Sequence, residues 1–198
     1  MFVKQVFDVC LASIGLLVLA PLFLAIAIWI KFDSKGPIMF RQQRVGQFER
    51  GFSIYKFRTM FTRSDESDSQ LTIGADTRIT RAGSFLRQYK LDELPQLINV
   101  IMGEMSIVGP RPEVPRYVAN YPANIKAIVL SVKPGITDFA SIQFRRENEI
   151  LASALDPEQV YIDNILPVKL EHYVRYVRNR TLWLDIMIIF STLKLVFD

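Results

Sequence analysis

The hydrophobic pattern of the chain begins with a long apolar run near the N-terminus. Residues 9–30 carry no charged side chain and read VCLASIGLLVLAPLFLAIAIWI. A helix needs about 20 apolar residues to cross the hydrocarbon core of a bilayer. The run therefore predicts a membrane helix. A cleaved signal peptide is the alternative, but its apolar part is shorter, roughly 7–15 residues.

Pro21 lies near the middle of this run. A proline inside a helix removes one backbone hydrogen bond and clashes with the preceding turn, so a kink or a break is expected at Ala20 and Pro21. Basic residues flank both ends of the run, with Lys4 before it and Lys31 and Lys35 after it. Because basic residues favour the cytoplasmic side, two topologies fit: a re-entrant helix that returns to the same side, or a kinked span with a short outer tail.

The rest of the pattern is that of a small unit in which helices dominate over β-structure, a mainly α, α+β fold. Apolar residues at 94, 97, 98 and 101 have helical spacing and predict a helix within residues 85–101. Residues 169–180 predict an amphipathic helix. Residues 182–197 are apolar, but Asp185 and Lys194 interrupt them, which favours an interfacial or a core helix over a span.

Two shorter segments complete the prediction. Residues 52–57 predict a strand, and the polar, acidic residues 64–76 predict a surface loop. We therefore expect two parts: residues 1–36 as a membrane helix with its junction, and residues 37–198 as a membrane-associated domain on the cytoplasmic side.

The amino-acid composition excludes several classes of protein and several kinds of metal site. Half of the 198 residues are hydrophobic and 22% are charged, which excludes a disordered chain. The formal net charge of +4 is too small to identify a nucleic-acid-binding protein. A single cysteine, Cys10, and a single histidine, His172, exclude a disulfide framework, a cysteine-based zinc site and a multi-histidine metal centre. A metal in this protein would have oxygen ligands.

Residues 41–63 form a basic stretch in which aromatic side chains are interleaved and Glu49 is the sole acid. Its basic residues are Arg41, Arg44, Arg50, Lys56, Arg58 and Arg63. Directly after a membrane segment, this composition is typical of a surface that faces lipid headgroups. Binding of single-stranded nucleic acid is an alternative interpretation. A solvated charged face over the predicted strand is another.

The candidate catalytic residues are the adjacent acids Asp92 and Glu93 in LDELPQL. Pro95 follows them, and proline is tolerated only in the first turn of a helix, so a helix is expected to begin near Asp92. Both carboxylates would then lie at a helix N-terminus, where free N–H groups also attract phosphate. Alternatively, Asp92 is a helix cap and Glu93 a first-turn acid.

Cations suited to phosphate surround this pair along the chain. They are Lys56, Arg58, Arg78, Arg87 and Arg111. Arg111 lies between Pro110 and Pro112, which restrict the backbone and lower the entropic cost of a bidentate contact with phosphate. The alternative is a rigid turn whose arginine pairs with a local acid.

These motifs together resemble a known family, the bacterial monotopic phosphoglycosyl transferases, also called initiating sugar transferases. The landmarks are the apolar run broken at Pro21, then PIMFRQQRVG, IYKFRTM, DTRITRAGSFLRQYKLDELPQLINVIMGEMSIVGPRP, KPGIT and NRTLWLD. The resemblance is colinear and covers nearly the whole chain. Among the members of the family, we expect the small single-module type.

The resemblance implies a role for each landmark residue. Asp92 is expected to be the nucleophile and Glu93 the Mg²⁺ ligand, while Lys56, Arg87 and Arg111 serve the phosphates. Pro21 is expected to make the membrane helix re-entrant. A carboxylate can attack phosphorus without a general base, so a chain with one histidine can perform covalent catalysis. His172 is accordingly expected to be structural, and Cys10 to act as a small hydrophobic residue.

The implied reaction transfers a phosphosugar from a UDP-sugar to polyprenol (undecaprenyl) phosphate, with release of UMP. It would proceed by a ping-pong mechanism through an aspartyl-phosphosugar intermediate, at the cytoplasmic face of the bacterial inner membrane. The expected partners are the UDP-sugar donor, the polyprenol phosphate acceptor, membrane lipids and downstream glycosyltransferases, and no nucleic acid. Two alternatives remain: a membrane-anchored phosphohydrolase, and a non-catalytic adaptor that binds lipid.

Some positions depart from the family pattern PGITGLAQV. The chain has Asp138 and Ser141 in place of Gly and Gln, Phe144 before Arg145, and Tyr173 where an acid is common. We expect Arg145 near the nucleotide. The candidates for sugar discrimination are Asp138, Arg146, Glu147 and Glu149.

Overall fold

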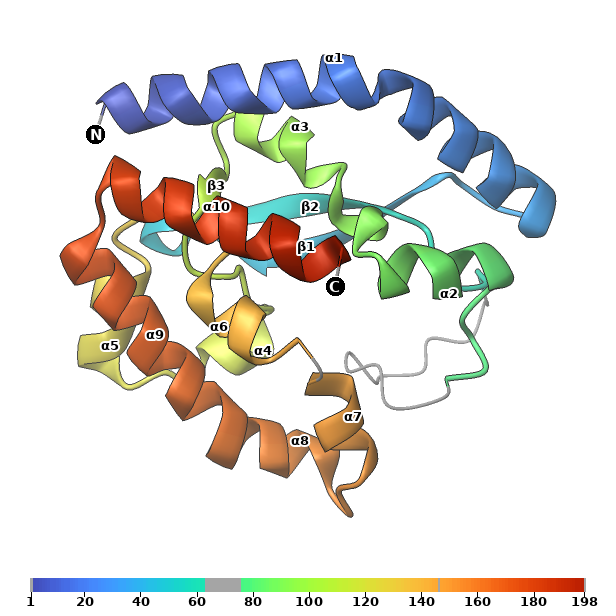
Figure 1. Ribbon diagram of the computed structural model, residues 1–198. Helices are drawn as coiled ribbons and strands as arrows, with labels where there is room; N and C mark the ends of the chain where they lie inside the picture. Colours follow the sequence, from blue (N-terminus) through green and yellow to red (C-terminus); the bar gives the residue numbers. More distant parts are fainter. Residues whose placement is uncertain (1, 63–75, 146, 198) are drawn as a thin grey trace.

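The computed structural model describes residues 2–62, 76–145 and 147–197, and the described part is mainly helical with two small sheets (Figure 1). The predicted fold class is therefore confirmed. The α-helices are α1 Phe2–Asp33, α2 Arg81–Gln88, α3 Gln96–Ile101, α4 Pro115–Val118, α5 Ala123–Val129, α6 Phe139–Gln143, α7 Glu147–Ala152, α8 Pro157–Val160, α9 Leu166–Asn179 and α10 Leu182–Phe197. Short 3-10 turns are η1 Gln47–Glu49 and η2 Leu91–Glu93, and a π-turn, η3 Tyr161–Ile165, precedes α9. The strands are β1 Met39–Val45, β2 Gly51–Phe57, β3 Ser106–Val108 and β4 Gly135–Thr137.

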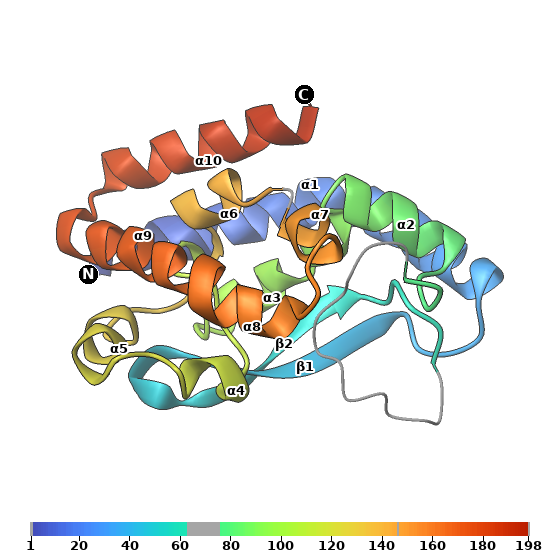
Figure 2. The same cartoon turned by 90° about the horizontal axis from the view of Figure 1, so that it is seen from below.

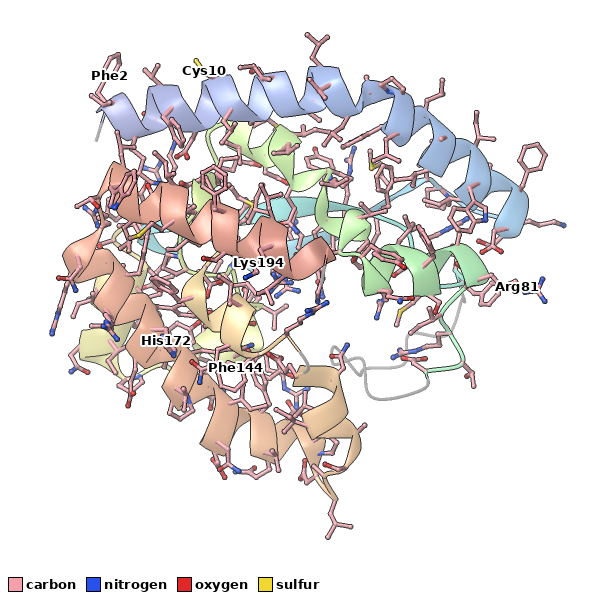
Figure 3. The ribbon with its side chains drawn as sticks, viewed as in Figure 1. Phe2, Cys10, Arg81, Phe144, His172 and Lys194 are labelled. Carbon is pink, nitrogen blue, oxygen red and sulfur yellow. The ribbon has the colours of Figure 1, made fainter. Side chains whose placement is uncertain are left out.

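Helix α1 contains the whole predicted membrane run and extends beyond it at both ends. It continues through Pro21 but bends partway along, so the proline produces a kink and not a break (Figure 1). Large apolar side chains of α1 are exposed, such as Leu17 at 78%. Phe2 and Cys10 point away from the rest of the molecule (Figure 3). An exposed apolar surface of this length indicates contact with lipid.

Both ends of α1 contact the rest of the protein through hydrogen bonds. Near the N-terminus, the Lys4 amine donates to Asp185 of α10 at 2.7 Å, and the Ser106 hydroxyl of β3 donates to Asp8 at 2.7 Å. At the C-terminal end, the Arg58 guanidinium donates to the carbonyl of Ser34 at 2.7 Å. The helix therefore lies along the domain and does not project from it.

Strands β1 and β2 form an antiparallel hairpin in which Met39 pairs with Phe57. The predicted strand at residues 52–57 is confirmed as β2. The hairpin packs against α3 through Asn99, which accepts a hydrogen bond from the Tyr55 amide at 3.0 Å and donates one to the Ser53 carbonyl at 2.8 Å. Asn99 therefore fixes the position of α3 relative to β2.

The helix predicted within residues 85–101 is interrupted, so that prediction is wrong as a single element. Lys90 has a left-handed backbone conformation with φ of 56°, which ends α2. The turn η2 follows, and α3 begins only at Gln96, with Pro95 at its cap. Asp92 and Glu93 therefore lie in a 3-10 turn before α3 and not at the N-terminus of an α-helix.

The C-terminal half of the structure tests the two helices predicted there. Helix α9 confirms the predicted amphipathic helix and begins a few residues earlier than expected. Helix α10 confirms the predicted helix at residues 182–197. In Figure 2, α10 lies at the top of the view and the β1–β2 hairpin at the bottom. The predicted acidic loop at residues 64–76 lies outside the described residues, apart from Asp76, and the division at residue 36 stays a prediction.

Candidate active site

The adjacent acids Asp92 and Glu93 lie in the turn between α2 and α3, and Asp92 is only 8% exposed. The left-handed conformation at Lys90 redirects the chain there, and η2 contacts both α2 and β2. The sequence LDELP thus places two carboxylates against the hairpin, in the interior of the domain.

Glu93 accepts hydrogen bonds from two cations that come from distant parts of the chain. The Lys56 amine of β2 donates to its Oε1 at 2.6 Å. Arg111, in the loop after β3, donates to both carboxylate oxygens, with Nη1 at 3.1 Å from Oε2. The structure therefore brings three predicted site residues into direct contact.

Asp92 differs from Glu93 in having one free oxygen. Its Oδ1 is buried and has no hydrogen-bond partner among the described residues. Arg87 of α2 and Lys56 both favour its ionised form. The Arg87 guanidinium is oriented by the hydroxyl of Thr59, to which its Nε donates at 2.8 Å. A buried oxygen without a partner is costly in a folded protein, so it indicates a functional group.

The two carboxyl groups have opposite pKa shifts. Burial raises the pKa of Asp92, and the neighbouring Glu93 raises it further, against the opposing effect of Lys56 and Arg87. Burial also acts to raise the pKa of Glu93, but Arg111 and Lys56 outweigh it and hold that pKa well below its usual range. Paired carboxyls with separated pKa values are typical of sites in which each acid has its own role.

Arg58 makes a different set of contacts, and Arg78 acts on the site through Arg87, whose pKa burial lowers and the charge of Arg78 lowers further. Arg58 is buried and donates to backbone carbonyls at the end of α1, including that of Lys35 at 2.6 Å. Its guanidinium binds the carbonyls of Ser34 and Lys35 in the segment directly after α1, which is a structural role. Arg78 forms an ion pair with Asp76 at 2.6 Å. Arg145 is exposed after α6.

The positions that depart from the family pattern are largely internal. Asp138 caps α6 by accepting hydrogen bonds from the Ser141 amide at 3.0 Å and the Ser141 hydroxyl at 2.6 Å. Tyr173 is buried, and its hydroxyl has no partner within the described ranges. Glu147 forms an ion pair with Lys169 at 2.5 Å. Arg146 and the side chain of Glu149 lie outside the described residues.

Sequence reasoning missed two buried charged residues near Arg111. Arg44 was noted only as one member of the basic stretch, and Glu113 was not considered. The Arg44 guanidinium lies 3.7 Å from the Glu113 carboxylate. The available signal was the acid that directly follows the GPRP motif. His172 lies on α9, and Cys10 is exposed within the apolar run of α1, so its expected behaviour as a small hydrophobic residue stays a prediction (Figure 3).

The donor set suits a hard cation. No group of three or more His, Cys, Asp or Glu side chains occurs in the part of the chain that the structure describes. Asp92 offers an oxygen without a partner, whereas both oxygens of Glu93 accept hydrogen bonds from Lys56 and Arg111. Mg²⁺ prefers a few carboxylate oxygens and keeps waters and substrate phosphates as its other ligands, so the residue types fit Mg²⁺, but Glu93 would hold the ion only by exchanging one of these hydrogen bonds.

Buried carboxylates beside Lys56, Arg87 and Arg111, together with an exposed apolar helix, describe a membrane-associated site for phosphate chemistry. A comparison with protein families agrees: residues 1–198 match the model of the family described as bacterial sugar transferase. The chain belongs to this family, so the family resemblance predicted from the sequence is confirmed.

Curated relatives carry names of the same kind. The chain is 38% identical over 197 residues to the UDP-N-acetylgalactosamine-undecaprenyl-phosphate N-acetylgalactosaminephosphotransferase of Aeromonas hydrophila, covering 98% of this chain and 44% of that protein. It is 42% identical over 193 residues to the UDP-glucose:undecaprenyl-phosphate glucose-1-phosphate transferase of Xanthomonas campestris pv. campestris, covering 96% and 37%. It is 33% identical over 208 residues to the exopolysaccharide production protein ExoY of Rhizobium meliloti (strain 1021), covering 98% and 84%. The chain thus spans less than half the length of the first two relatives.

Proposed function

We propose that the protein transfers a phosphosugar from a UDP-sugar to polyprenol phosphate and releases UMP, as a membrane step of exopolysaccharide or related glycan assembly. The observation that carries the proposal is the free, buried Oδ1 of Asp92 beside Glu93, Lys56, Arg87 and Arg111. Membership of the bacterial sugar transferase family and the names of the relatives support it.

The reaction would occur in two displacements. In the first, Oδ1 of Asp92 forms a bond to the sugar-bearing phosphorus, the bond from that phosphorus to the UMP oxygen breaks, and UMP leaves with the electron pair. In the second, a phosphate oxygen of polyprenol phosphate attacks the acyl phosphate and Asp92 leaves as a carboxylate. Lys56, Arg87 and Arg111 offset the charge of the phosphates. Mg²⁺, which Glu93 would hold, would supply further charge neutralisation.

The contacts of α1 support a re-entrant topology. A spanning helix has its ends on opposite sides of a hydrocarbon core about 30 Å thick. Here Lys4, near one end of α1, contacts Asp185, and Ser34, just beyond the other end, contacts Arg58. One folded domain therefore contacts both ends, which is compatible with entry and exit on the same face. Since UDP-sugars are made in the cytoplasm, we place the domain on the cytoplasmic face of the inner membrane.

The test is UMP release by the purified protein with Mg²⁺ and a panel of UDP-sugars that includes UDP-glucose and UDP-N-acetylgalactosamine. Each donor is assayed with and without undecaprenyl phosphate, beside the Asp92→Asn variant. The proposal expects UMP release that depends on lipid and is lost in the variant. UMP release that ignores lipid would favour a hydrolase, and silence across the panel from folded protein would favour the adaptor.

The variant needs a matched control. Asp163→Asn removes an exposed carboxylate that accepts a hydrogen bond from Gln159 at 2.7 Å, away from the Asp92 turn. It should keep the activity of the unaltered protein. Retention of even a tenth of the activity in Asp92→Asn would refute Asp92 as the nucleophile.

A further inference from the structure

The loop that carries Arg111 is fixed on its N-terminal side by a close backbone contact. The Gly109 amide donates to the Thr137 carbonyl of β4 at 3.1 Å, and the Gly135 amide donates to the Pro110 carbonyl at 2.9 Å. A Cβ atom at Gly135 would lie 2.1 Å from the Gly109 nitrogen, so the two chains approach as closely as glycine allows. This side of the loop therefore has little freedom.

The C-terminal side of the same loop is bound by the end of β1. The Arg44 guanidinium donates from Nη1 to the Pro112 carbonyl at 3.0 Å and from Nη2 to Gln42 at 2.7 Å. The Val45 amide donates to the Glu113 carbonyl at 3.0 Å. Arg44 thus holds the residue that directly follows Arg111.

Glu113 forms an ion pair with the Arg44 guanidinium and so helps to fix its position. Its carboxylate is buried, with Oε2 at 3.7 Å from the Arg44 guanidinium and Oε1 accepting a hydrogen bond from the Tyr161 hydroxyl at 2.7 Å. A buried carboxylate is stable only when it is paired and hydrogen-bonded. Arg44 and Tyr161 meet that requirement for Glu113, while the Nε of Arg44 has no hydrogen-bond partner among the described residues.

The charge of Arg44 also acts on Arg111. The two guanidinium groups repel each other, while Glu93 attracts both. Glu113, the partner of Arg44, also attracts Arg111, so charge alone does not orient the Arg111 guanidinium. Arg44 therefore acts on Arg111 mainly through its hydrogen bond to the Pro112 carbonyl.

We propose that Arg44 and Glu113 are positioning residues that hold the Arg111 loop so that its guanidinium meets the diphosphate of the donor. The inference rests on the proposed function, because it takes a nucleoside diphosphate sugar as the ligand of Arg111. Neither Arg44 nor Glu113 contacts the reacting atoms in this assignment.

A double-mutant cycle tests the assignment. The probe is UDP in the presence of MgCl₂, and its dissociation constant is measured by calorimetry on the full chain in detergent. The variants are Arg44→Gln, Arg111→Gln and the double variant.

Arg44→Gln should weaken UDP binding roughly tenfold, as coupled neighbours do. In the Arg111→Gln background the same change should alter the UDP dissociation constant less than twofold, because the Arg111 guanidinium that Arg44 positions is no longer present. A merely structural role would weaken binding equally in both backgrounds, and additive effects would overturn the proposal.

Further variants keep the test decisive if Arg44→Gln folds poorly. Arg44→Lys retains the charge but cannot donate to Pro112 and Gln42 together, and Glu113→Gln retains an acceptor for Tyr161 but loses its charge. Both should fold and give intermediate losses of UDP affinity that also vanish in the Arg111→Gln background. Arg41→Gln removes an exposed arginine of the same strand, stacked 4.9 Å from the Tyr55 ring centre, and should leave UDP affinity unchanged.

The readout separates this proposal from the proposed function. Coupled losses of UDP affinity in a protein that fails to release UMP with lipid would leave the positioning role intact and refute the transferase. Lipid-dependent UMP release together with additive effects of Arg44→Gln and Arg111→Gln on UDP affinity would support the transferase and refute the positioning role. Lack of UDP binding by the unaltered protein would refute both.

Discussion

At the scale of single residues, the site depends on a division of charge between Asp92 and Glu93. Glu93 is held ionised by Lys56 and Arg111, so it is a permanent negative charge next to Asp92. That charge is one reason why the pKa of Asp92 is raised. Lys56 and Arg87 oppose this rise without cancelling it, so both cations favour the ionised form of Asp92.

Removal of the Glu93 charge should therefore change the metal dependence of UMP release. In Glu93→Gln, the amide is a weaker ligand for Mg²⁺ and a weaker partner for Arg111 and Lys56, so UMP release should need more Mg²⁺ and fall about tenfold or more. A Mg²⁺ titration measures this. Glu171→Gln removes an exposed acid of α9 and is the matched control. An unchanged titration in Glu93→Gln would remove Glu93 from the metal site.

Arg87→Gln should change the pH dependence of the reaction. Only ionised Asp92 can attack phosphorus, so activity is lost as the pH falls through the pKa of Asp92. Arg87 lowers that pKa, and its removal raises the pKa further. The acidic limb of kcat/KM should therefore move to higher pH. A pH-rate profile of both proteins checks the direction, and a limb that moves to lower pH contradicts the assignment.

The sequence predicted Lys56, Arg87 and Arg111 because each stands in a short motif whose chemistry is visible without coordinates. It could not separate Arg58 from Lys56, two residues away on the same segment. Alternation would place both side chains on one face of an extended chain, but β2 ends at Phe57, so Arg58 lies beyond the strand and reaches the end of α1 while Lys56 reaches Glu93. Arg44 and Glu113 were missed because their pairing joins positions far apart in the sequence.

At the scale of elements, the interruption between α2 and α3 is what exposes the acids to the cations. Periodicity predicted one helix because Leu94, Leu97 and Ile98 keep helical spacing. It could not register the left-handed Lys90, since nothing in the pattern marks a lysine for that conformation. The pattern predicted α1, β2, α9 and α10. It did not predict β1, β3, β4 or the short helices α4–α8, because such short segments carry too few positions to show a clear period.

The β3–β4 pair gives a stability prediction. Gly135→Ala would place a Cβ 2.1 Å from the Gly109 nitrogen, so the backbone must move, and the free energy of unfolding should fall by about 1–3 kcal/mol. Activity should fall as well, because the Arg111 loop moves with Gly109. Gly51→Ala is the control, since its nearest neighbour would be 3.9 Å away. Thermal unfolding in detergent measures both, and equal stability of the two variants would contradict the prediction.

Helix α10 gives a prediction about membrane contact. Its exposed side chains include Trp183 at 68%, Phe190 at 68% and Leu193 at 50%, while Asp185 and Ile188 are buried. Such an amphipathic helix suits the headgroup region of a bilayer. In a Trp29→Phe variant, lipids with brominated acyl chains should quench Trp183 fluorescence. Quenching by aqueous iodide alone would show that α10 faces water.

At the scale of the whole molecule, the long contact between α1 and the domain supports the re-entrant topology proposed above. The re-entrant model predicts that a cysteine in place of Phe2, which is 79% exposed, stays on the cytoplasmic side. In a Cys10→Ser background, an impermeant thiol reagent should not label Phe2→Cys in intact cells and should label it once the cells are opened. Labelling of intact cells would establish a spanning helix.

The contact between Arg58 and the end of α1 also limits the distance between the membrane helix and the carboxylates of the candidate active site. Arg58 binds carbonyls where the membrane helix ends, and Lys56, two residues earlier in the chain, binds Glu93. Two residues of extended chain measure about 7 Å. Only a short segment of backbone joins the end of the membrane helix to the contact with Glu93. The depth of the candidate catalytic carboxylates in the membrane therefore follows the depth of that helix. Where the bilayer thins locally, the proposed site would therefore follow the membrane helix, and its depth relative to that helix would not change.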